Sequence, residues 1–182
     1  MEGLVFSASP NTSSFQMVAL ENISALSSSV LGSPVNVTVQ PGATFQVDQD
    51  GLSVNSNLVS SFNGVSAVIV GQDIQVRRVS GDGSTATPIV ADRVRLRMSR
   101  FTAKVATKVD ANTFTVDTST IKLFSDNGIT QITVDASQAQ FEPSTVNVSS
   151  LQVGDTVSLR GLLFKQAAPT SPLLVASKVR KR

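Results

Sequence analysis

Hydrophobic and polar residues alternate with a period of two through most of the chain. The clearest stretches are residues 35–39 (VNVTV), 93–98 (RVRLRM), 113–117 (TFTVD) and 156–159 (TVSL). Strands with one buried and one exposed face show this pattern, because successive side chains point to opposite faces of a sheet. Turn-forming Asp-Gly or Asn-Gly pairs lie at residues 50–51, 63–64, 82–83 and 127–128. Helical periodicity is confined to residues 23–31 and 57–62. The pattern therefore predicts an all-β protein.

The second half of the chain repeats the first. The longest match aligns residues 68–77 (VIVGQDIQVR) with residues 151–160 (LQVGDTVSLR) without gaps. Residues 90–97 (VADRVRLR) align in the same way with residues 175–182 (VASKVRKR). Four shorter blocks keep the same order, pairing 3–5 with 103–105, 14–17 with 113–116, 35–39 with 130–134 and 43–45 with 139–141. These ordered matches predict two tandem copies of one module, at residues 1–99 and 100–182.

Each copy has room for about five or six strands, and a small closed barrel would remove the exposed edges of such a sheet. We therefore predict two tandem OB-like β-barrels, with small β-sandwiches as the alternative. No Pro/Gly-rich linker separates the copies, so the last strand of the first should lead almost directly into the second. Phenylalanines recur at matched positions, Phe15 with Phe114 and Phe45 with Phe141, which predicts that all four are core residues.

Several segments of the second copy resemble a bacterial family of small β-barrel domains of unknown function. They are NTFTVDTSTI (112–121), ITVDASQAQF (132–141), SSLQVGDTVSLRG (149–161) and LLVASKV (173–179). Members of that family show a "GNTFTVDG … LKVGDxVxVxG" pattern, often in tandem copies within secreted or lipid-anchored envelope proteins. The first copy matches this pattern only loosely. The resemblance implies an extracytoplasmic β module, in the periplasm, on the cell surface or secreted, and it supplies no catalytic residues.

The chain contains no His, Cys, Trp or Tyr. These absences exclude zinc sites built on His or Cys, Ser-His-Asp and Cys-His catalysis, and thiol redox chemistry. A hydrolase built on paired carboxylates stays open, although Asp110, Asp126 and Asp155 lie beside turn signals, where Asp is favoured for backbone hydrogen bonds. We predict that the protein is not an enzyme and uses no cofactor or metal. No apolar stretch is long enough for a transmembrane helix, and the N-terminal residues lack the basic region and apolar run of a signal peptide.

Two motifs match the residue pattern of a known ligand-binding site but lack the sequence context that such a site requires. Residues 81–86 (GDGSTA) fit the dinucleotide fingerprint, but a Thr-Pro pair and a strand follow where that chemistry needs a helix. Residues 48–51 (DQDG) could begin a calcium loop, but the next residues lack the further carboxylate that such a loop requires. We predict a hairpin turn for the first motif and a structural turn for the second.

Charge is distributed unevenly along the chain. Residues 1–76 contain five acids and no Lys or Arg, whereas residues 77–182 contain 15 basic and 8 acidic residues. Each copy ends in a basic stripe whose alternate residues share one strand face. The stripes comprise Arg93, Arg95 and Arg97 in the first copy and Lys178, Arg180 and Arg182 in the second.

Two functional hypotheses follow from these stripes. In the first, the protein is a structural or binding module that contacts another protein or an envelope polymer, and the stripes are solvated or dock on the acidic first half. In the second, the stripes form a polyanion- or oligonucleotide-binding face of an OB-type barrel. The absence of Trp and Tyr argues against nucleic acid, since base stacking needs aromatic side chains.

Overall fold

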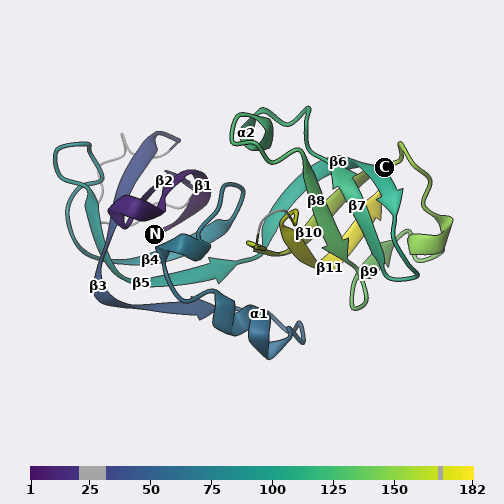
Figure 1. The fold of residues 1–182 in the computed structure, drawn as a ribbon, viewed down its shortest axis with the longest axis horizontal. Coiled ribbons are helices and arrows are strands. Elements are labelled where there is room, and N and C mark those ends of the chain that lie inside the picture. The colour runs from purple at the N-terminus through teal and green to yellow at the C-terminus, as the bar shows by residue number, and fades with distance from the viewer. Residues whose placement is uncertain (21–31, 168–169) are drawn as a thin grey trace. The chain divides into compact units, whose positions relative to one another are not determined.

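The computed structural model describes residues 1–20, 32–167 and 170–182 (Figure 1). The chain forms two compact units, which comprise Met1–Asp48 with Asn55–Arg97 and Gln49–Val54 with Met98–Arg182. Each unit is a closed five-stranded barrel of mixed strand directions, and the helices are few and short. The prediction of an all-β protein with two OB-like barrels is confirmed.

The first barrel has the strand order β1-β2-β3-β5-β4, and β4 pairs back onto β1 to close it. β3 and β5 run parallel, and the other neighbours are antiparallel. The strands are β1 (Glu2–Ser9), β2 (Ser14–Ala19), β3 (Pro34–Val47), β4 (Asp73–Ser80) and β5 (Ile89–Arg97). This order with one parallel pair is the Greek-key closure of an OB-type barrel.

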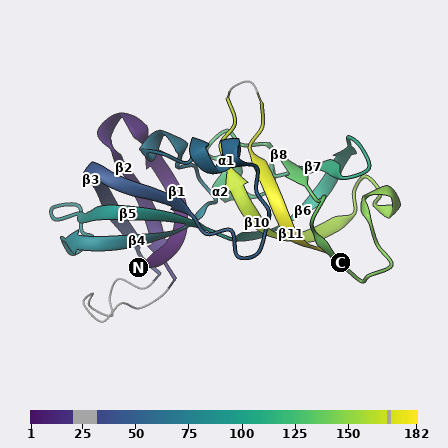
Figure 2. The same ribbon diagram turned by 90° about the horizontal axis from the view of Figure 1, so that it is seen from below.

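The second barrel repeats this topology with one strand divided in two. β10 pairs with both β6 and β11 and so closes the barrel, and β10 and β11 lie side by side in Figure 2. β8 and β9 both run parallel to β11, one after the other, and together take the place of β3. The strands are β6 (Ser99–Lys108), β7 (Thr113–Asp117), β8 (Gln131–Asp135), β9 (Gln140–Glu142), β10 (Thr156–Phe164) and β11 (Leu173–Lys181).

Strand pairing corrects one block of the predicted repeat. Phe15 lies opposite Val37 in the first barrel, and its counterpart Phe114 lies opposite Val134 in the second. Val37 therefore corresponds to Val134, so residues 35–39 match residues 132–136 and not 130–134. A shift of two residues leaves every side chain on the same face, so the alternating pattern cannot detect it. The other blocks that fall in paired strands keep the predicted register.

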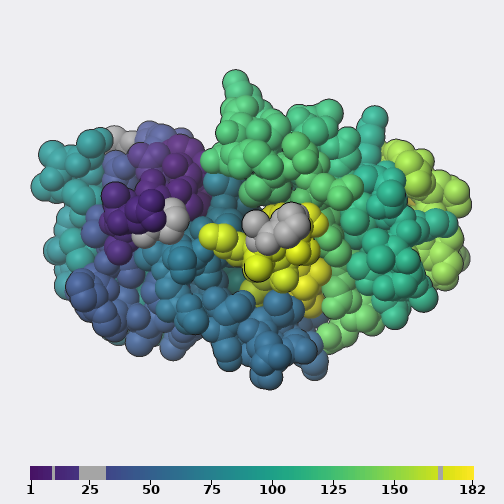
Figure 3. Space-filling model, in the orientation of Figure 1, coloured from purple at the N-terminus to yellow at the C-terminus, as the bar shows by residue number. Residues whose placement is uncertain are grey.

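Short helices lie in the connections. α1 (Ser56–Ser61) follows β3, and this confirms the helix predicted at residues 57–62. The helix predicted at residues 23–31 lies outside the described residues. α2 (Lys122–Ser125) lies in the β7–β8 connection, which projects from the second unit in Figures 1 and 3. Among the described residues, no helix is long and apolar enough to cross a membrane.

Alternate strand residues fill the two barrel interiors. Phe15 and Phe114 are 2% and 0% exposed, as the repeat predicted. The prediction that Phe45 and Phe141 are also core residues was wrong, since both are only half-buried. Phe45 lies in the second half of β3, where no residue is fully buried, and packs edge-to-face on Phe62 at a ring distance of 5.6 Å. Between the units, the single residue Met98 separates β5 from β6.

Candidate binding groove

The two predicted basic stripes lie on outward faces of equivalent strands. Arg93, Arg95 and Arg97 alternate with buried residues along β5, and Lys178 and Arg180 do so along β11. Arg182 directly follows β11 and continues that stripe, since its backbone N–H bonds to the carbonyl of Thr156 in β10. The stripes belong to different units and have different partners.

Carboxylates neutralise most of the first stripe. Arg97 Nη1 lies 2.8 Å from an Asp48 carboxylate oxygen, and Arg97 Nε lies 3.7 Å from Glu2. Arg95 is 3.9 Å from the same Asp48 oxygen. These side chains are about one-fifth to one-third exposed, so the pairs form at a partly solvated surface. The outer face of β5 is therefore a mixed face of alternating charge.

A further arginine of the first barrel, on β4, forms an ion pair with an aspartate. Arg77, which lies opposite Arg93, donates from Nε and Nη2 to the two oxygens of Asp92 at 2.7 and 2.6 Å. This two-point hydrogen bond lowers the pKa of Asp92 and raises that of Arg77. Three acids, Glu2, Asp48 and Asp92, thus accompany the basic face of the first barrel.

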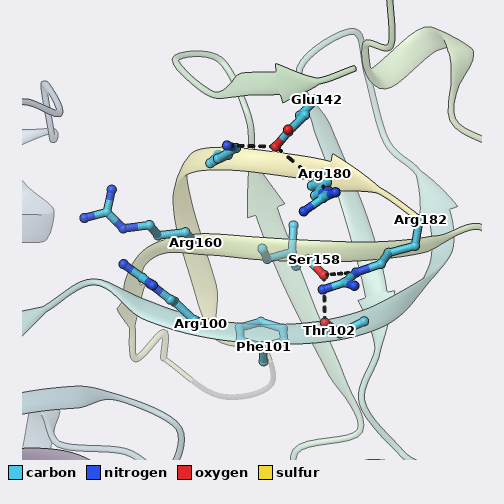
Figure 4. A pocket seen from close by; sticks show the side chains of 10 residues that line it. Arg100, Phe101, Thr102, Glu142, Ser158, Arg160, Arg180 and Arg182 are labelled. Atoms are coloured by element: carbon cyan, nitrogen blue, oxygen red, sulfur yellow. Dashed lines mark hydrogen bonds and ion pairs between the residues drawn. The ribbon is translucent and has the colours of Figure 1, made fainter. Parts of the chain in front are cut away.

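The second stripe borders a surface groove of about 590 Å³ on the outer face of β6, β10 and β11. Figure 4 shows the side chains around this basic groove. Five of them are basic, and Thr102 and Ser158 lie between them. The lining residues are Arg100, Phe101, Thr102, Glu142, Ser158, Leu159, Arg160, Lys178, Arg180 and Arg182.

Strand register brings three cations side by side. Arg160 on β10 lies directly opposite Arg100 on β6 and Lys178 on β11. Like charges in directly opposite positions destabilise a sheet, so this rung runs against the ordinary preference for strand pairs. Arg100 and Arg160 were not predicted as site residues. The repeat aligns Arg160 with Arg77, another arginine, and Arg100 shares a strand face with Thr102, two positions on, so both residues could have been noticed in the sequence.

The next rung of the ladder carries hydroxyls. Ser158 lies opposite Thr102 on β6 and Arg180 on β11. Arg182 donates from Nε to Ser158 Oγ at 2.8 Å, and the Ser158 and Thr102 hydroxyls share a hydrogen bond at 2.9 Å (Figure 4). These bonds hold the Arg182 guanidinium over β10, beside a pair of hydroxyls that keeps one O–H free to donate to an oxyanion.

Two carboxylates reach the basic groove. Glu142 on β9 lies 2.8 Å from Lys178 Nζ and 3.9 Å from Arg180. The hydrogen bond from Lys178, together with both positive charges, lowers the pKa of Glu142. Asp50, from the segment of residues 49–54 that belongs to the second unit, lies 2.7 Å from Arg160 Nη2. Five cations and two anions leave the groove with a net charge of +3.

No known protein-family model and no curated protein matches this chain. The two small five-stranded barrels agree with the fold implied by the sequence resemblance.

Equivalent positions of the two barrels explain their difference in charge. The repeat places Glu2 at the position of Thr102, Asp73 at that of Thr156, and Asp92 at that of Ser177. Strand pairing supports this equivalence, since Leu4 lies opposite Asp73 and Lys104 lies opposite Thr156. At each of these positions a carboxylate of the first barrel is a hydroxyl in the second. The second barrel therefore lacks these three acids around its basic residues, although Glu142, at the position of Gln46, and Asp50 add two others.

The two remaining sequence motifs are turns. Residues 81–86 lie in the β4–β5 connection, where Asp82 accepts hydrogen bonds from the Ser84 backbone at 2.9 Å and from the Thr87 hydroxyl. A strand follows this loop, which confirms the predicted hairpin. Asp48 and Asp50 each accept from an arginine. Within residues 1–20, 32–167 and 170–182, no group of three or more acidic side chains is placed to hold a metal ion.

Proposed function

We propose that this chain is a non-enzymatic binding module whose second barrel holds a linear polyanion in the basic groove. The observation that carries the proposal is the replacement of three carboxylates by hydroxyls around a basic ladder that both barrels inherit. These exchanges remove three negative charges from around the ladder, and the groove keeps a net charge of +3 even with Glu142 and Asp50. Residues that break a local pairing rule are commonly those that bind a ligand.

The spacing of the groove suits a repeating ligand. Basic side chains two positions apart on one strand repeat at roughly 6.6–6.8 Å, and neighbouring strands are about 4.8 Å apart. The groove thus offers cations in two directions, along β11 and across β6, β10 and β11. Arginine and lysine bind phosphate or sulfate by charge-assisted hydrogen bonds. The hydrogen-bonded pair of Thr102 and Ser158 can add one hydroxyl donor between these charges.

The acids of the protein support a non-catalytic role. General acids in hydrolases are carboxyls whose pKa is raised. Six acids of the described residues have their pKa lowered by hydrogen bonds or nearby cations. These are Asp82, Asp92, Asp110, Asp117, Glu142 and Asp155. Such groups stay ionised near neutral pH and hold turns or arginines.

The basic groove offers charge without an open aromatic surface. Phe101, its aromatic residue, is half-buried and packs edge-to-face on Phe124 of α2 at a ring distance of 5.3 Å. Binding of single-stranded nucleic acid relies on stacking of bases on aromatic rings. We therefore propose an anionic polymer of the bacterial envelope as the partner. The extracytoplasmic location follows from the sequence resemblance and is part of the same proposal.

Binding to heparin, a sulfated linear polymer, at a series of NaCl concentrations tests the proposal. If three to five anionic groups are contacted, log Kd should change with log salt with a slope of roughly 2 to 4. The variant Lys178→Gln/Arg180→Gln should weaken binding by at least tenfold at 0.1 M NaCl. The matched control is Arg93→Gln/Arg95→Gln, which removes two cations at the equivalent positions of the first barrel.

The result that would overturn the proposal is equal binding by the two double variants, or no salt-dependent binding of the natural chain. A parallel titration with a thymidine oligonucleotide separates the two classes of polyanion. Tighter binding of the oligonucleotide than of heparin, at equal charge, would favour nucleic acid over other linear polyanions.

A further inference from the structure

We infer that the Asp50 carboxylate competes with a bound polyanion for Arg160 in the basic groove. Only a polyanion of high charge density can then bind. This inference rests on the proposed function, because it concerns the affinity of the same groove. Its basis is the short segment Gln49–Val54, here called the strap, which is packed as part of the second unit although it follows β3 in the chain.

Two contacts fix the strap in place. The Gln138 side chain binds both backbone groups of Ser53, since Nε2 donates to the Ser53 carbonyl at 2.7 Å and Oε1 accepts from the Ser53 N–H at 2.9 Å. Leu52, next to it, is only 9% exposed although its neighbours Gly51 and Ser53 are exposed. A segment with a buried apolar side chain and a two-point backbone contact keeps its position, so the placement of Asp50 is built into the unit.

Asp50 is turned towards Arg160 by its backbone. It has a φ of +46°, in the left-handed region that few residues other than glycine adopt, and Gly51 follows with a φ of +85°. The Asp50 carboxylate then accepts a 2.7 Å hydrogen bond from Arg160 Nη2. Asp adopts this conformation more readily than most residues other than glycine. The left-handed backbone at position 50 is therefore compatible with the carboxylate that binds Arg160.

Arg160 is the position where such a carboxylate has most effect. It is the central residue of the rung formed with Arg100 and Lys178. Any polymer that crosses β6, β10 and β11 passes over Arg160. An anionic group of that polymer must either share the Arg160 guanidinium with the Asp50 carboxylate or displace that carboxylate. The side chains of Asp50 and Arg160 are 56% and 37% exposed. An ion pair exposed to this degree is weak, so a densely charged polymer can displace it and a sparsely charged one cannot.

The test compares heparin binding by the natural chain and the variant Asp50→Asn, which removes the charge and keeps the side-chain volume. One additional phosphate- or sulfate-type contact should steepen the salt dependence by about 0.9 and tighten binding roughly three- to tenfold at 0.1 M NaCl. Gln138→Ala, which releases the strap and leaves Asp50 intact, should tighten binding by a smaller factor. Asp126→Asn removes a charge from an exposed residue next to α2 and controls for net charge.

Circular dichroism confirms that each variant is folded before its affinity is measured. Salt-dependent binding by the natural chain with no gain in Asp50→Asn would overturn this inference and leave the proposed function standing. An equal gain in Asp126→Asn would also overturn it, because net charge alone would then explain the effect. If neither the natural chain nor Asp50→Asn binds, the proposed function itself fails.

Discussion

Glu2 in β1 and Thr102 in β6 occupy the same position of the two barrels, and each lies next to the arginine that ends its basic stripe. Glu2 pairs with Arg97 at 3.7 Å, whereas Thr102 shares a hydrogen bond with Ser158, which accepts from Arg182. The same strand geometry therefore holds an ion pair in one barrel and a guanidinium hydrogen-bonded to a hydroxyl in the other.

The variant Thr102→Glu should convert the second groove to the charge pattern of the first. A carboxylate beside Arg182 would neutralise one cation and repel the polymer, so heparin binding should weaken by roughly three- to tenfold at 0.1 M NaCl. Isothermal titration calorimetry measures this change. Val109→Glu adds the same charge on an exposed turn and should have a much smaller effect. Equal losses in the two variants would show that the position of the charge is irrelevant.

The variant Gly161→Ala should disturb the sheet directly next to Arg160. A Cβ at Gly161 would lie 2.3 Å from the Val175 carbonyl oxygen and 2.8 Å from Ala176 Cα, both of them backbone atoms. Overpacking of this kind costs about 1–3 kcal/mol of unfolding free energy, measurable by urea denaturation. Gly64→Ala is the control, since its Cβ would meet only Ser66 Oγ at 3.8 Å. A Gly161→Ala protein as stable as the natural chain would contradict this account of the close strand approach.

Phe114→Ala should remove a large part of the second core. Phe114 is 0% exposed, and loss of a buried phenylalanine costs about 3–5 kcal/mol. Its counterpart Phe15, at 2% exposure, should show a similar loss when changed to alanine. Val109→Ala, at a site 61% exposed, should change the free energy of unfolding by less than about 0.5 kcal/mol. Equal stability of the Phe114→Ala and Val109→Ala proteins in urea would refute the core assignment.

Asp82→Asn should change the acid stability of the β4–β5 loop. Hydrogen bonds from the Thr87 side chain and the Ser84 backbone lower the pKa of Asp82 to about 2. Because the folded pKa is below the unfolded value, the ionised carboxylate stabilises the protein above about pH 4. That contribution is lost as the pH falls towards 2. The Tm of Asp82→Asn should therefore be lower than that of the natural chain at pH 7, with the two values converging near pH 2. A constant difference in Tm from pH 7 to pH 2 would count against the assignment.

The sequence was sufficient for the fold class, because period-two alternation and turn pairs are local properties of the chain. It was also sufficient to recognise the repeat, since matched blocks keep their order in both copies. The register of residues 35–39 required the structure, because only the pairing of Phe15 with Val37 and of Phe114 with Val134 separates the two alignments. The half-buried state of Phe45 and Phe141 likewise depends on which end of a barrel each occupies.

For the candidate site, the sequence identified one strand out of three. Lys178, Arg180 and Arg182 alternate along one stretch of chain and are visible in any strand pattern. Arg100 and Arg160 join them through pairing between residues that are 18 and 60 positions apart, which no local pattern records. The contribution of Asp50 was the hardest to foresee, because it is separated from Arg160 by 110 positions and comes from the other repeat copy.

The strap also bears on how such a tandem protein can be divided. A fragment beginning at Ser99, the first residue of β6, would contain all strands of the second barrel and every residue that lines its groove. It would leave behind Asp50, the buried Leu52 and the backbone partner of Gln138. If Asp50 competes for the groove as inferred, an isolated second copy should bind heparin more tightly than the whole chain, because the repeat boundary separates the groove from its competing carboxylate.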